Sequence, residues 1–62
     1  MTKPAFNIRD RVYHVTPDSP EGIVIDVQYN YASGIYLYQV SFSPTQASLW
    51  YFEIELSYNK SF

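Results

Sequence analysis

The stretch IYLYQVSF, residues 35–42, alternates more regularly than any other part of the chain. One alternating set is Tyr36, Tyr38, Val40 and Phe42, and the other is Ile35, Leu37, Gln39 and Ser41. Successive side chains of a β-strand point to opposite faces, so this period of two predicts a strand. We expect the bulkier first set to face the core, with Tyr36 capping one end of it and keeping its hydroxyl in water.

Shorter segments of similar composition lie on both sides of this strand. They are RVYHV (residues 11–15), GIVIDVQY (22–29), LWYFE (49–53) and a last short strand that contains Leu56. Val, Ile, Tyr and Phe suit a pleated surface, while the Pro, Asp, Ser and Gly residues between the segments suit turns. Helical spacing is nearly absent, so the chain predicts a small all-β domain of short strands.

The sequence also predicts local backbone features at both glycines and in one irregular strand. Val24 and Val27 lie an odd number of residues apart, and a β-bulge or a strong bend would bring both to one face. Gly22 is expected to allow a close approach or an unusual backbone angle at a strand start. Gly34 is expected to supply a positive φ in the turn before residue 35.

Four short motifs follow this order of strands: Asp10-Arg11-Val12, Gly22-Ile23-Val24, Tyr38-Gln39-Val40-Ser41-Phe42 and Glu55-Leu56. In this the chain resembles the SH3-like barrels, above all the branch with KOW, Tudor and CarD-type domains and the small photosystem I subunit PsaE. The resemblance implies an all-β, five-stranded SH3-like barrel. The resemblance covers roughly residues 8–58, and we expect residues 1–62 to form a single SH3-like barrel domain with this core and flexible ends.

The expected core is aromatic and aliphatic, because a chain of 62 residues without cysteine has no disulfides to stabilise it. We expect these side chains inside: Val12, Val24, Tyr38, Val40, Phe42, Trp50, Phe52 and Leu56. Trp50 and Phe52 are placed there because they share one face of the segment LWYFE, and a small barrel needs their bulk.

Composition and charge exclude several classes of function. The net charge is −2 and the pI is about 5.0, without the basic footprint of a nucleic-acid binder. The first residues lack the apolar region of a signal peptide, and no apolar run is long enough to cross a membrane. We therefore expect a cytoplasmic protein that contacts neither nucleic acid nor membrane and is a monomer rather than an oligomer.

No residues form a recognisable catalytic or metal-binding set, so we expect no enzyme activity, no cofactor and no metal. His14 lacks a nucleophile and an orienting acid, and is interpreted as a strand residue at the barrel rim. Four acidic residues lack the spacing of a calcium loop: Asp10, Asp18, Glu21 and Asp26. Arg9 and Arg11 either clamp a phosphate or, as we favour, form cross-strand ion pairs with Glu53 and Glu55.

Some aromatic and apolar side chains fall outside the expected core, and these are the candidate binding residues: Tyr13, Tyr29, Tyr31, Leu37 and Tyr51. Exposed aromatic clusters often mark interaction sites. The favoured hypothesis is a small non-enzymatic protein-interaction module that binds a protein or peptide. The alternative is a nucleic-acid-associated domain of KOW or Tudor type, in which tyrosines stack on bases. Against it, RNA-binding KOW domains usually present basic loops, whereas the loops here are neutral or acidic.

Overall fold

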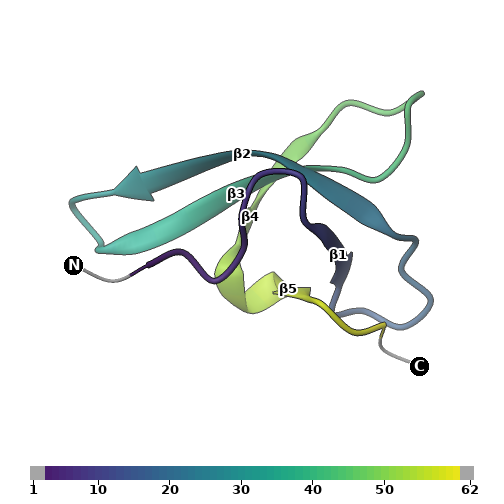
Figure 1. Cartoon of the computed structure of the whole chain (residues 1–62), viewed down its shortest axis with the longest axis horizontal. Helices are drawn as coiled ribbons and strands as arrows, with labels where there is room; N and C mark the ends of the chain where they lie inside the picture. Colours follow the sequence, from purple (N-terminus) through teal and green to yellow (C-terminus); the bar gives the residue numbers. More distant parts are fainter. Residues whose placement is uncertain (1–2, 61–62) are drawn as a thin grey trace.

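The computed structural model describes residues 3–60 and shows an all-β chain (Figure 1). The expected flexible ends fall partly on residues outside this range. The strands are β1 (Arg11–His14), β2 (Gly22–Asn30), β3 (Ile35–Ser41), β4 (Leu49–Phe52) and β5 (Leu56–Ser57), and a short 3-10 helix, η1 (Glu53–Glu55), separates the last two. The predicted strand order along the chain is confirmed.

All strand pairs are antiparallel, and they form one five-stranded sheet with the order β4-β3-β2-β1-β5. The first strand therefore pairs with the last, as expected. The sheet is not closed into a barrel: within residues 3–60 no ladder joins β4 to β5. The reason is local, because η1 follows β4 at once and β5 has only 2 residues, both paired with β1.

The longest pairing is the β2–β3 hairpin, which projects beyond the rest of the sheet (Figure 1). Its register shifts between Val24 and Asp26, an irregularity of the kind predicted for this strand. Val24 is buried and Val27 packs against the core, so the irregularity brings both to one face. At the tip, Gly34 has a φ of 70°, as the turn was predicted to require.

The core consists of Phe6, Val12, Val24, Tyr38, Val40 and Leu56, with Val27, Tyr36, Phe42 and Tyr51 packed partly buried against it. The predicted inner face of β3 is thus confirmed. Gly22 meets the expectation of a close approach, because a Cβ there would lie 2.6 Å from Phe42 Cδ1 and 2.7 Å from Val40 Cγ1.

The expected burial of Trp50 and Phe52 is wrong. Trp50 is 43% exposed and Phe52 is 50% exposed, while Tyr51 between them faces the core. The register explains the reversal, because Tyr51 lies opposite buried Tyr38 and directly opposed residues share a face. All four residues of β4 are apolar or aromatic, so the sequence pattern alone does not define which alternate pair is inside.

Phe6 supplies the aromatic bulk that Trp50 was expected to provide. Its ring lies edge-on to Tyr38, with centroids 5.2 Å apart, and against Tyr58 at 4.9 Å. Phe6 belongs to the segment before β1, which has no strand pattern and was not expected in the core. This N-terminal segment covers the inner face of the sheet.

Candidate functional site

The outer face of the sheet carries a contiguous group of large apolar side chains. Leu37 lies opposite Phe52 in the β3–β4 ladder, and Trp50 lies one alternate position along β4. Ile35 shares the outward parity of Leu37, and Ile54 follows Phe52 in η1, where it is 85% exposed. We call this group the outer apolar surface: Ile35, Leu37, Trp50, Phe52 and Ile54.

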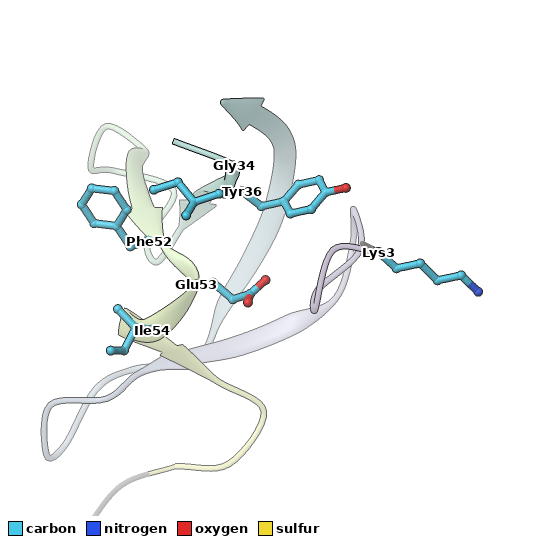
Figure 2. A pocket seen from close by; sticks show the side chains of 7 residues that line it. Lys3, Gly34, Tyr36, Phe52, Glu53 and Ile54 are labelled. Carbon is cyan, nitrogen blue, oxygen red and sulfur yellow. The ribbon is translucent and has the colours of Figure 1, made fainter. Parts of the chain in front are cut away.

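A cleft of about 450 Å³ lies at one end of the outer apolar surface, where the hairpin tip approaches η1. Its lining consists of Lys3, Gly34, Ile35, Tyr36, Phe52, Glu53 and Ile54. In Figure 2, Phe52 and Ile54 project to one side, whereas Tyr36 and the Glu53 carboxylate project to the other. The cleft therefore joins an apolar side to a side that carries a carboxylate and an aromatic ring.

Glu53 is held in place by hydrogen bonds to one of its carboxylate oxygens. The hydroxyl of Tyr38 donates to Oε1 at 2.7 Å, and the backbone N–H of Ala5 donates to the same oxygen at 3.2 Å. Burial of the Tyr38 ring, followed by its hydrogen bond to Glu53, raises the pKa of Tyr38 to about 12. The buried hydroxyl stays protonated at neutral pH and orients the carboxylate at the edge of the cleft.

A second tyrosine and carboxylate fasten the N-terminal segment over the inner face. The Tyr58 hydroxyl lies 2.5 Å from Asp10 Oδ2 and 3.1 Å from the carbonyl oxygen of Ala5. The hydrogen bond from Tyr58, with a further one from the backbone N–H of Asn7, lowers the pKa of Asp10, and the same contact with Asp10 raises the pKa of Tyr58. These contacts hold Phe6 on the core.

The candidate binding residues do not lie together in one surface. Only Leu37 belongs to the outer apolar surface. Tyr31 is at the hairpin tip and is 87% exposed. Tyr29 is half-buried on the inner side, with its ring centroid 4.8 Å from those of both Tyr31 and Tyr36. The tyrosines of the hairpin therefore pack largely on one another.

The other two candidates lie elsewhere. Tyr51 faces the core and contacts Phe42, with ring centroids 5.6 Å apart, so its expected outward position is wrong. Tyr13 is half-buried on β1, and its hydroxyl donates to Glu21 at 3.3 Å. The residues that sequence reasoning missed are Ile35, Trp50, Phe52 and Ile54. The run of apolar residues from position 49 to 54, broken only by Glu53, was the available signal.

The predicted partners of the basic residues are also wrong. Arg11 lies 3.9 Å from Glu21, since β1 pairs with β2 at this end and reaches β5 only from Tyr13 onward. Glu55 instead lies 3.5 Å from Nε2 of His14, which is a partly buried residue of β1. The other predicted acidic partner, Glu53, accepts from Tyr38 as described.

Within residues 3–60, no group of three or more His, Cys, Asp or Glu side chains is placed to hold a metal ion. In the same range, no helix is long and apolar enough to cross a membrane. Comparisons with protein-family models, curated proteins and solved structures gave no match to this chain.

Proposed function

We propose that the protein is a small non-enzymatic interaction module and that a partner protein docks on the outer apolar surface. The observation that carries this proposal is the exposure of Trp50, Phe52 and Ile54 on consecutive elements, beside the cleft of about 450 Å³. Scattered apolar residues are normal on any protein surface, whereas contiguous groups that include aromatic rings mark interaction sites.

The contrast with the inner face supports a binding role. Both faces of β3 and β4 carry large apolar side chains, but the N-terminal segment covers only the inner one. Over the outer face, no segment within residues 3–60 buries Phe52 or Ile54. Tryptophan and phenylalanine are enriched at interface centres, where they bury a large area with few rotatable bonds.

We also propose that the fold is of the SH3-like type. The strand order β4-β3-β2-β1-β5, with a 3-10 helix between β4 and β5, supports an SH3-like arrangement. Small folds of this kind host many functions, so the binding proposal depends on the outer apolar surface and not on the fold.

The test compares two variants of nearly equal exposure. Ile54→Ser removes an apolar side chain from the outer apolar surface, and Tyr31→Ser removes one from the hairpin tip, the two residues being 85% and 87% exposed. In affinity capture from native lysate, partner recovery is expected to fall with Ile54→Ser and to persist with Tyr31→Ser. Equal recovery by both variants, or loss only with Tyr31→Ser, contradicts the proposal.

A further inference from the structure

We infer that the cleft between the hairpin tip and η1 accepts an alkylammonium group, such as a lysine side chain of the partner, with Glu53 as the charged recognition residue. This inference rests on the proposed function and specifies the chemistry of the partner at one end of the outer apolar surface. It follows from the shape of the cleft, its lining and the hydrogen bonds of Glu53.

The lining suits a ligand with an apolar stem and a cationic head. Phe52 and Ile54 offer hydrocarbon on one side, and the Glu53 carboxylate and the Tyr36 ring lie on the other (Figure 2). A volume of about 450 Å³ is within the range of small-ligand sites and exceeds what one such stem requires. An ammonium group near Glu53 would also be attracted by the face of an aromatic ring such as that of Tyr36.

The hydrogen bonds that the Glu53 carboxylate already accepts favour an ammonium ligand over a guanidinium ligand. Both contacts from Tyr38 and Ala5 fall on Oε1, so Oε2 retains its capacity to accept. A guanidinium gains most from a bidentate pair that uses both oxygens of a carboxylate. With Oε1 already accepting two hydrogen bonds, a single charged donor fits better than a fork.

Lys3, at the rim of the cleft, carries a positive charge like the inferred ligand. It therefore allows the role of charge in binding to be checked. In Figure 2 its side chain extends away from the Glu53 carboxylate. A cationic ligand would therefore be repelled weakly by Lys3 and attracted by Glu53. Removing the Glu53 charge should lower the affinity of a cationic ligand, and removing the Lys3 charge should raise it. The affinity of a purely apolar ligand would not respond in this way.

The experiment uses three small probes that share a four-carbon stem: n-butylammonium, n-butanol and pentanoate. Each is titrated into the isotope-labelled protein, and the backbone amide resonances of Phe52, Glu53 and Ile54 are followed by NMR. Butylammonium is expected to bind about tenfold more tightly than butanol, which is the effect of one charge-assisted hydrogen bond, and more tightly than pentanoate. Its affinity alone should fall as salt is raised.

The variants test which charge is responsible. Glu53→Gln keeps an oxygen that can accept from Tyr38 and should remove the preference for butylammonium, whereas Lys3→Gln should strengthen butylammonium binding about twofold, as expected for loss of a screened surface repulsion. If butanol binds in the cleft as well as butylammonium does, the inference is overturned while the apolar docking surface stands. If no probe shifts these resonances, or if Glu53→Gln keeps the preference, the inference is also overturned.

Discussion

The two faces of the β3–β4 ladder carry similar side chains but differ in how far these are buried. On the inner face, Tyr38 and Tyr51 lie opposite each other, and Tyr38 is wholly buried. On the outer face, Leu37 lies opposite Phe52, and half of the Phe52 surface is exposed. The difference arises because the core side chains Phe6, Val12, Val24 and Leu56 pack on the inner face only. Burial in this ladder therefore depends on which face the rest of the chain covers, and not on the polarity of β3 and β4 alone.

The two faces should also differ in what their side chains contribute, stability on the inner face and binding on the outer face. Side chains that Phe6 and the N-terminal segment cover should contribute to the free energy of unfolding. Side chains on the outer apolar surface should contribute little to it and should instead affect partner capture. The following variants test this division, beginning with the largest expected effect.

Tyr38→Ala should unfold the protein or nearly so. Replacing a fully buried ring by alanine costs about 3–5 kcal/mol, which is comparable to the whole stability of many domains of this size. Thermal and urea unfolding followed by circular dichroism will measure it. Tyr38→Phe is the matched control, which keeps the ring and loses about 1.5–3 kcal/mol with the hydroxyl, because that hydroxyl donates to a carboxylate. A native-like transition in Tyr38→Ala would mean that the inner face is wrongly assigned.

Gly22→Ala should be the next most damaging change. The new Cβ would lie within 2.7 Å of Phe42 and Val40, and overpacking of this kind costs about 1–3 kcal/mol. Gly34 is the control, because it has a positive φ but a Cβ there would meet only the Tyr29 hydroxyl, at an ordinary contact distance of 3.8 Å. Gly34→Asn should unfold close to wild type, since asparagine tolerates that conformation. Equal melting temperatures for Gly22→Ala and wild type would refute the close approach.

Tyr58→Phe should destabilise the fold in a pH-dependent way. The folded pKa of Asp10 is lowered from its usual 3.8, so the stability from this contact is present above that pH and is lost as pH falls through the lowered value. The folded pKa of Tyr58 is raised from 10.0, so the stability is lost again as pH rises through the raised value. The difference between wild type and variant should therefore be greatest near neutral pH and decrease on both sides. Urea titrations at acidic, neutral and alkaline pH measure it, and a constant difference would contradict the assignment.

Ile54→Ser and Tyr31→Ser should have the smallest effects on stability. Both side chains are more than four-fifths exposed, and surface substitutions usually change stability by no more than about 0.5 kcal/mol. Their melting curves should nearly coincide with that of the wild type. A large loss of stability in Ile54→Ser would show that the outer apolar surface is structural, and the division between the two faces would fail.

The sequence predicted those parts of the fold in which local pattern and tertiary packing agree. The period of two in β3, the irregularity between Val24 and Val27 and the positive φ of Gly34 are confirmed because each depends on neighbouring residues alone. The side of β4 that is buried depends on the register with β3, which the uniformly apolar LWYF does not encode. Phe6 was missed because a single aromatic in an irregular segment has no periodicity.

The candidate site was predicted less well for the same reason. Leu37 was placed outward correctly because β3 has a clear alternation. Phe52 and Trp50 were assigned to the core, on the assumption that a small domain must bury its largest rings. Ile54 lies in η1, where the chain leaves the β pattern, and strand parity therefore gives no orientation for it.

The most direct test of a docking role for the outer apolar surface is site-specific photocrosslinking. The photoreactive residue p-benzoylphenylalanine replaces Phe52 in one protein and Tyr31 in another, and both are irradiated in native lysate under identical conditions. A discrete covalent adduct is expected from position 52 and none of the same mass from position 31. An adduct from position 31 alone, or none from either position, would contradict the docking role.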